Sequence, residues 1–192
     1  MITTVIFDFF GVVSSEVAPF WFGARFPHEV ALRLKQKYME PADHGDIGKE
    51  ELFAQLSALS GEMAEDIEAE FSRLAVINRE TVDIIKSLKG KYQIGLLSNA
   101  QAEWLEEILE REGLRGLFDT EVISGRVRAT KPSPEIYKIA LNRLGIASKE
   151  AVFIDDNPKN VRAAEALGIH GITFESAGKL RCDLSALGVN LP

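Results

Sequence analysis

The sequence has a single cysteine, Cys182, among its 192 residues, so no internal disulfide can form. It also lacks an apolar run long enough to cross a bilayer, because its longest apolar runs have only the length of a β-strand. The first residues lack the basic start and the small-residue cleavage site of a signal peptide. These absences predict a cytoplasmic globular protein with no membrane partner.

A basic surface is also missing. The chain has 22 Lys and Arg against 29 Asp and Glu, which gives a formal net charge of -7, and it has no basic cluster. Contacts to a nucleic-acid backbone require concentrated Lys and Arg, so no nucleic-acid partner is expected, although a small anion can still bind locally. The hydrophobic fraction of 46% is that of an ordinary globular protein, and nothing in the sequence indicates an oligomeric state.

Five short apolar runs predict β-strands, at residues 4–9, 93–97, 121–124, 151–154 and 171–174. The runs are continuously apolar instead of alternating, which is typical of a parallel sheet covered by helices on both faces. After residue 90 the strands alternate with helical stripes, for example at residues 104–109 and 136–144. This alternation predicts an α/β fold with a doubly wound parallel sheet.

The stretch from residue 15 to residue 88 interrupts the alternation. It contains apolar stripes of helical spacing at residues 52–59, 67–74 and 82–88, and no convincing strand. We therefore predict an α/β core made of residues 1–14 and 89–192. A small helical domain, residues 15–88, is predicted to be inserted after the first strand.

Polar side chains follow four of the predicted strands. They are Asp8 at the end of the first strand, Ser98 and Asn99 after the second, Lys131 in the loop after the third, and Asp155 and Asp156 after the fourth. In open parallel sheets, ligands bind beyond the carboxyl ends of the strands, where such loops converge. Alone, Asp8 is equally typical of a turn or helix cap, the acidic pair is more often a turn and cap, and a loop lysine is usually solvated. Their order at successive strand ends nevertheless indicates one shared site.

The residue types of this set are those of phosphoryl chemistry. A carboxylate at the position of Asp8 can attack phosphorus or carbon covalently. The adjacent acids Asp155 and Asp156 indicate a hard cation, and Mg²⁺ bound by carboxylates and a substrate phosphate fits this pattern. Lys131, in a proline-rich turn, can neutralise a phosphoryl group. The Ser98 hydroxyl and the neighbouring backbone amides can bind phosphoryl oxygens.

These motifs resemble those of the haloacid dehalogenase (HAD) superfamily. Residues 5–12, Val-Ile-Phe-Asp-Phe-Phe-Gly-Val, resemble its first motif, and residues 95–99, Gly-Leu-Leu-Ser-Asn, its second. Lys131-Pro132 with residues 135–137 resembles the third motif, and residues 152–157, Val-Phe-Ile-Asp-Asp-Asn, the fourth. The helical insert resembles the family's small cap. Its residues 45–53 resemble the cap of a subgroup that includes sugar-phosphate phosphatases and the amino-terminal domain of epoxide hydrolases.

The resemblance implies a Mg²⁺-dependent hydrolase that acts on a small phosphorylated substrate. Asp8 would be the nucleophile that forms an aspartyl-phosphate, and Lys131 would neutralise charge. Ser98, Asn99 and Lys131 would bind the phosphate.

The metal ligands implied by the resemblance are Asp8, the backbone carbonyl of Phe10, and the pair Asp155 and Asp156, of which one ligates directly. Position 10 departs from the family's pattern, because phosphatases of the family usually carry a second aspartate there. That aspartate protonates the leaving oxygen and then activates water, and a phenyl ring can do neither. General acid–base catalysis is typically worth about 10²- to 10⁴-fold in rate.

Two alternatives to the phosphatase therefore remain open. The first is a catalytically impaired binding or regulatory protein that keeps the fold and the metal site. The second is a 2-haloacid dehalogenase, because those enzymes carry an aromatic residue at the position of Phe10. The Asp155-Asp156 pair argues against the dehalogenase, since dehalogenases of this family do not need Mg²⁺.

Overall fold

A computed structural model describes residues 1–191. Five parallel strands form one sheet in the order β3-β2-β1-β4-β5. Their bounds are β1 Thr4–Phe7, β2 Gln93–Ser98, β3 Thr120–Ile123, β4 Ala151–Asp155 and β5 His170–Thr173. The prediction of a doubly wound parallel α/β fold is confirmed.

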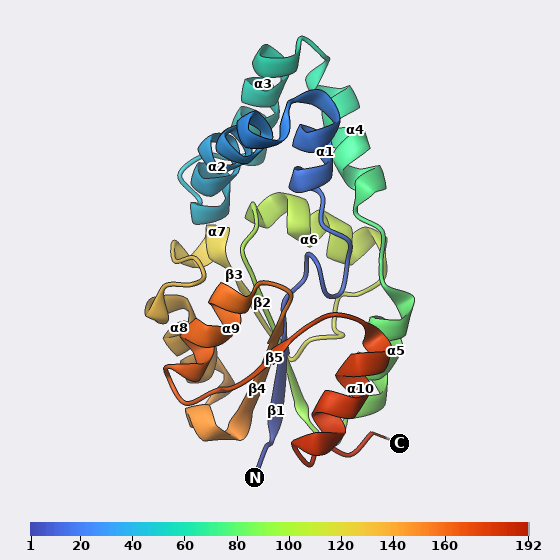
Figure 1. The fold of residues 1–192 in the computed structure, drawn as a ribbon, viewed down its shortest axis with the longest axis vertical. Coiled ribbons are helices and arrows are strands. Elements are labelled where there is room, and N and C mark those ends of the chain that lie inside the picture. The colour runs from blue at the N-terminus through green and yellow to red at the C-terminus, as the bar shows by residue number, and fades with distance from the viewer. Residues whose placement is uncertain (192) are drawn as a thin grey trace.

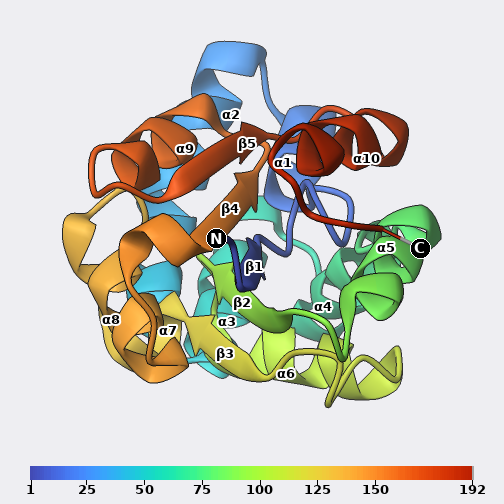
Figure 2. The ribbon, with the colours of Figure 1, turned by 90° about the horizontal axis from the view of Figure 1, so that it is seen from below.

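Helices cover both faces of the sheet (Figure 2). Helices α5 (Arg79–Leu88), α6 (Ala102–Arg111) and α10 (Ala177–Ala186) lie on one side, and α8 (Pro134–Leu144) and α9 (Pro158–Glu165) lie on the other. Successive side chains of a strand point to opposite faces. Val5 and Phe7 of β1 accordingly join one apolar cluster, while Ile6 joins the other. Burial on both faces explains why the strands are continuously apolar.

The strand ends differ slightly from the predicted ends. β1 stops at Phe7 instead of Phe9, because the chain turns at Gly11, where φ is +83°, and the Phe9 carbonyl accepts the backbone N–H groups of residues 12–14. Asp8 therefore lies just beyond the strand. Ser124 was predicted as the last residue of the third strand, but it begins the short helix α7 (Ser124–Val127).

Four helices form a layer above the carboxyl ends of the strands (Figure 1). They are α1 (Ala18–Arg25), α2 (His28–His44), α3 (Lys49–Ser60) and α4 (Ala64–Leu74). Trp21, Phe53 and Phe71 are buried among them, and the Phe71 ring packs against Trp104 of α6 with a centroid distance of 5.5 Å. A short 3-10 helix, Ser148–Glu150, precedes β4. None of the helices formed by residues 1–191 has the length and apolarity needed to cross a membrane.

Two chain segments connect this helical layer to the sheet, and they lie side by side. The Ser15 N–H donates to the Val76 carbonyl at 2.9 Å, and the Asn78 N–H donates to the Val13 carbonyl at 2.9 Å. The Ser15 hydroxyl also donates to the carbonyl of Leu74 at 2.5 Å. The two segments therefore form one paired connection.

Helix α5 packs against α10 beside the sheet (Figure 1). Its residues Ile84, Ile85 and Leu88 are fully buried in the cluster on that face of the sheet. We therefore propose that the cap ends near residues 75–78, before α5, whereas the sequence pattern alone placed this boundary after residue 88.

Shortening a buried side chain of α5 is expected to destabilise the whole protein. Ile85→Ala removes a fully buried side chain from this face and should lower the free energy of unfolding by about 2–5 kcal/mol in urea titrations. Val76→Ala shortens a side chain that is 64% exposed and should change it by less than about 0.5 kcal/mol. Equal effects of the two variants would contradict the assignment of α5 to the core.

Candidate active site

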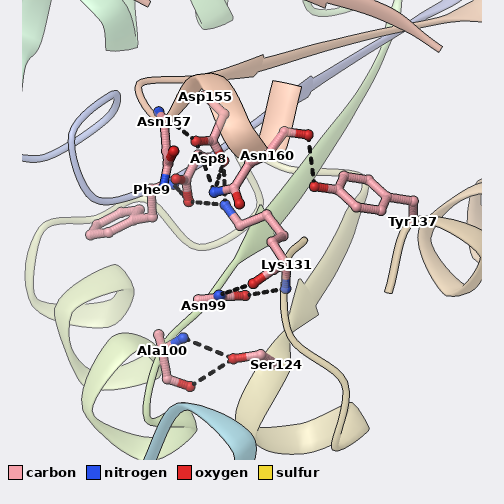
Figure 3. A network of polar contacts seen from close by, with 10 residues as sticks. All are labelled: Asp8, Phe9, Asn99, Ala100, Ser124, Lys131, Tyr137, Asp155, Asn157 and Asn160. Atoms are coloured by element: carbon pink, nitrogen blue, oxygen red, sulfur yellow. Dashed lines mark hydrogen bonds and ion pairs between the residues drawn. The ribbon is translucent and has the colours of Figure 1, made fainter. Parts of the chain in front are cut away.

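Polar residues predicted from the strand ends lie close together, and Figure 3 shows Asp8, Lys131 and Asp155 in one network of contacts. Lys131 Nζ lies 2.8 Å from Asp8 Oδ1 and 2.6 Å from Asp155 Oδ2. Carboxylate oxygens of Asp8, Asp155 and Asp156 lie within 4.8 Å of one another. Residues from three separate loops thus form a single cluster of charges.

Asp8 is oriented by its immediate neighbours. Its backbone N–H donates to the Ile154 carbonyl of β4 at 2.9 Å, and its Oδ1 accepts the N–H of Phe9 at 2.7 Å. Burial raises the pKa of Asp8 well above its ordinary value, and Asp155 adds to this rise, while Lys131 opposes it. Ionised Asp8 therefore depends on nearby positive charge.

Lys131 is held from both ends. The Asn99 side chain binds its backbone twice, donating from Nδ2 to the Lys131 carbonyl at 2.9 Å and accepting the Lys131 N–H at 2.8 Å. The ammonium is buried, which lowers the pKa of Lys131, but the carboxylates of Asp8 and Asp155 outweigh burial and raise it. Lys131 is therefore a fixed cation. The Asn99 side chain is committed to positioning it, so only the Asn99 backbone N–H remains for a phosphate.

The oxygens of Asp155 are occupied by donors of the protein. Besides Lys131, they accept the Asn157 N–H at 2.8 Å and the Asn160 amide at 3.0 and 3.1 Å. Asn160 is in turn fixed by its own carbonyl, which accepts the Tyr137 hydroxyl at 2.9 Å. The position of Asn160 at the start of the helix after the acidic pair had indicated a supporting role at the metal site. Tyr137 was not among the predicted site residues, because its spacing in the sequence marked it as part of an apolar helical stripe.

Asp156 differs from its neighbour. Within the described residues, its carboxylate accepts no hydrogen bond from another residue. Burial raises the pKa of Asp156 to about 6, with further contributions from the carboxylates of Glu16 and Asp155. A Cβ added at Gly11 would overlap this carboxylate, so glycine is required there both for space and for its φ of +83°.

The cluster has the ligands of a hard divalent cation. Three carboxylates face one ammonium, so the site carries excess negative charge. The Phe10 carbonyl accepts no hydrogen bond from residues 1–191 and is available as a neutral oxygen ligand. Oxygen-only ligand sets of this kind suit Mg²⁺.

Ser98 offers a donor without a partner. It is fully buried at the end of β2, and its hydroxyl makes no hydrogen bond to the described residues. A buried hydroxyl left unpaired costs about 1–3 kcal/mol, so such a group indicates a missing partner.

The charged cluster opens into a cavity of about 160 Å³ between the sheet and the cap. From the core, the cavity is lined by Trp104, whose ring stacks on Phe10 at a centroid distance of 5.1 Å and an interplanar angle of 10°. The other core residues of the lining are Asp8, Phe10, Asn99, Lys131, Asp156, Asn157 and Asn160. From the cap side, it is lined by Glu16, Val17, Ala18, Lys35, Met39 and Asp43. The sequence did not single out any of these cap-side residues.

Asp43 of α2 is a cap residue whose pKa is strongly raised. The pKa of Asp43 is raised to about 7, chiefly by burial, while Glu16 and Glu40 add to the rise and Lys35 and Lys131 oppose it. The protonated form therefore persists up to neutral pH.

Replacement of Asp43 should stabilise the protein in a pH-dependent manner. A carboxyl whose pKa rises on folding contributes stability below its unfolded pKa of about 4, and this contribution is lost as the pH rises through about 7. The difference in the free energy of unfolding between Asp43→Asn and the wild type should therefore shift by about 1–3 kcal/mol in favour of the variant from pH 5 to pH 8, after allowance for solvent screening. Urea unfolding at both pH values measures it. Glu29→Gln, at the exposed start of α2, is the control without such a gain. A pH-independent difference would contradict the raised pKa.

Comparison with known proteins agrees with this geometry. Residues 2–168 match the haloacid dehalogenase-like hydrolase family. D-ribitol-5-phosphate phosphatase of Bacteroides thetaiotaomicron is 25% identical over an alignment of 203 positions, which includes 97% of this chain and 98% of that protein. Flavin mononucleotide hydrolase 1 of Arabidopsis thaliana is 44% identical over 61 residues, which cover 32% of this chain and 25% of that protein. Several other curated relatives are matched over about half of their length or less.

A solved structure shows the same fold. It is a HAD family enzyme of Bacteroides thetaiotaomicron in complex with magnesium and inorganic phosphate, with a TM-score of 0.76 and 24% identity over 91% of this chain and 95% of that one. Since the family match covers residues 2–168 of 192, the chain belongs to the haloacid dehalogenase-like hydrolase family.

Proposed function

We propose that the protein is a Mg²⁺-dependent phosphatase that hydrolyses a small phosphorylated metabolite in the cytoplasm through an aspartyl-phosphate at Asp8. The observation that carries this proposal is the buried ammonium of Lys131, which bridges Asp8 and Asp155 at the base of the cavity. The relatives that are named phosphatases of phosphorylated carbohydrates and of D-ribitol 5-phosphate support the substrate class.

The first step transfers the phosphoryl group to the protein. An Asp8 carboxylate oxygen attacks phosphorus, and the bond from phosphorus to the leaving oxygen breaks. Lys131, the Ser98 hydroxyl and the Asn99 backbone N–H bind the phosphoryl oxygens and stabilise the charge that they carry. The leaving group departs on the side opposite Asp8, because attacking and leaving oxygens lie roughly in line.

The metal ligands of the proposal are Asp8, the Phe10 carbonyl and Asp156. When bound there, Mg²⁺ would neutralise the charge of the phosphoryl group and of the nucleophile. Asp156 is assigned as the direct ligand because its carboxylate has no hydrogen-bond donor from another described residue, whereas Asp155 is engaged by Lys131, Asn157 and Asn160. Asp155 would instead orient Lys131.

The second step releases phosphate. Water attacks the phosphorus of the aspartyl-phosphate, the bond to Asp8 breaks, and the free carboxylate returns. Phe10 cannot take the proton of this water. Nitroaryl and acyl phosphates, whose leaving groups need little protonation, are therefore the preferred probes of the activity.

Turnover of p-nitrophenyl phosphate and acetyl phosphate should require both Mg²⁺ and Asp8. Asp8→Asn, which removes the nucleophile, should lower kcat at least about 10³-fold, and EDTA should abolish turnover. The Phe10→Asp variant should turn over both substrates faster than the wild-type protein. Activity retained in Asp8→Asn would overturn the assignment of the nucleophile.

The alternatives give different results in the same assay. Mg²⁺ binding without hydrolysis of either phosphate would favour the impaired binding protein. Metal-independent release of chloride from 2-chloropropionate would favour the dehalogenase.

Substitutions in the acidic pair should separate the two roles. Asp156→Asn removes a direct ligand and should raise the half-saturating Mg²⁺ concentration more than about 100-fold. Asp155→Asn should raise it about 10- to 100-fold at most and should lower kcat instead, because it loosens Lys131. Mg²⁺ titration of p-nitrophenyl phosphate turnover measures both quantities. The reverse order of the two Mg²⁺ effects would assign direct ligation to Asp155.

A further inference from the structure

The proposed reaction needs a proton that position 10 cannot supply. When phosphorus transfers to Asp8, an alkoxide or phenoxide must be protonated as it leaves. The Phe10 ring carries no acidic group and is packed between aromatic neighbours, stacked on Trp104 and edge-on to Phe9 at 5.0 Å. Any proton donor must therefore come from another wall of the cavity.

The leaving oxygen faces the cap. Asp8 rises from the sheet below the cavity, and in-line displacement places the leaving oxygen on the far side of phosphorus. The acidic side chains that line the cavity from that side are Glu16 and Asp43. Glu16 lies near the acidic metal cluster, where its charge raises the pKa of Asp156. Asp43 lies toward Lys131, and both of them line this cavity and the adjoining one.

The backbone of Asp43 is fixed to the core. The Ser124 hydroxyl of α7 donates to the Asp43 carbonyl and accepts the N–H of Ala100 at 2.9 Å. Ala100 follows the phosphate-binding residues Ser98 and Asn99 directly. One hydroxyl thus ties the end of α2 to the loop that would hold the phosphate.

The close approach of two glycines reinforces this contact. Gly45, which ends α2 with a φ of +82°, lies so near the Gly125 carbonyl that a Cβ would overlap it. The carboxyl group of Asp43, in contrast, makes no hydrogen bond to residues 1–191. The backbone of Asp43 is therefore held in place, while its carboxyl proton is not engaged by another described residue.

We propose that Asp43 is the general acid and base of the reaction, in place of the missing aspartate at position 10. This inference rests on the proposed phosphatase function. The Asp43 carboxyl gives its proton to the leaving oxygen as the phosphorus–oxygen bond breaks, and it becomes a carboxylate. It then accepts a proton from the water that attacks the aspartyl-phosphate. Phosphate and free Asp8 result, and Asp43 is protonated again.

The surroundings of Asp43 suit this cycle. The pKa of Asp43 is raised to about 7, so both protonation states are populated near neutral pH, where a general acid and base works best. The charged groups that influence it are Lys35 and Glu40 on the same helix, Glu16 before α1, and Lys131 from the core. Charged residues on the other packed helices are engaged elsewhere, Arg25 with Glu62 and Glu70, Lys49 with Glu68 and Glu107, Arg126 with Glu106, and Arg128 with the Gly45 carbonyl.

A series of aryl phosphates with leaving groups of different basicity tests the acid role. In the full-length protein with Mg²⁺, Asp43→Asn should lower kcat/KM for phenyl phosphate about 10²- to 10⁴-fold. The same variant should lower kcat/KM for 2,4-dinitrophenyl phosphate less than about 3-fold, because that leaving group needs no proton. Glu29→Gln, at the far end of α2, is the matched control and should leave both values unchanged.

The base role predicts a second signature. With 2,4-dinitrophenyl phosphate, Asp43→Asn should release one equivalent of dinitrophenolate in a rapid burst and then turn over slowly, because hydrolysis of the aspartyl-phosphate lacks its base. Phe10→Asp in the Asp43→Asn background should restore turnover of phenyl phosphate, which also shows that the variant is folded.

The outcomes separate this inference from the proposed function. Equal losses across the series, an unchanged phenyl phosphate reaction, or a leaving-group-dependent loss in Glu16→Gln in place of Asp43→Asn would overturn the role of Asp43 and leave the phosphatase intact. If the wild-type protein hydrolyses no member of the series with Mg²⁺, the proposed function fails, and the role of Asp43 fails with it.

Discussion

The contact of the Lys131 ammonium with two buried carboxylates is the constraint around which the rest of the site is arranged. A buried ion cluster of this kind is costly to desolvate, and it persists only where its charges are paired and hydrogen-bonded. Asn99 fixes the backbone of Lys131, and Asn160 and the Asn157 N–H satisfy Asp155. The excess negative charge that remains at the three carboxylates favours the binding of a divalent cation.

The arrangement also explains why adjacent residues of one motif have different surroundings. Asp155, the last residue of β4, is turned toward Lys131 and α9, whereas the carboxylate of Asp156, the first residue after the strand, lies against the Gly11 turn. Gly11 has room for this carboxylate only because it has no side chain. The turn after β1 and the end of β4 therefore fit each other through a single missing Cβ.

The sheet and the core of the site could be predicted from the sequence because both depend on local rules. Continuously apolar strands indicate a covered parallel sheet, and the carboxyl ends of parallel strands converge, so Asp8, Ser98, Lys131 and Asp155 had to be close together. The cap side of the cavity could not be predicted in this way. Asp43 and Lys35 reach the cavity because α2 packs on α7 through Gly45, Gly125 and Ser124, and no periodicity in the sequence encodes that contact.

Phe10 also takes part in the packing between core and cap. Its ring lies in an apolar stack with Trp104, which in turn packs against Phe71 of the cap, so the position that usually carries an acid here contributes to the apolar contact between core and cap. An aspartate at position 10 would lie beside Asp8 through the chain itself. Asp43 is on α2, so it lies near Asp8 only because the cap packs on α7. If Asp43 supplies the proton, the chemistry therefore depends on the contact between α2 and α7. The Ser124 hydroxyl, which accepts the Ala100 N–H and donates to the Asp43 carbonyl, joins the proposed acid to the loop that would hold the phosphate, so one contact between cap and core serves both groups.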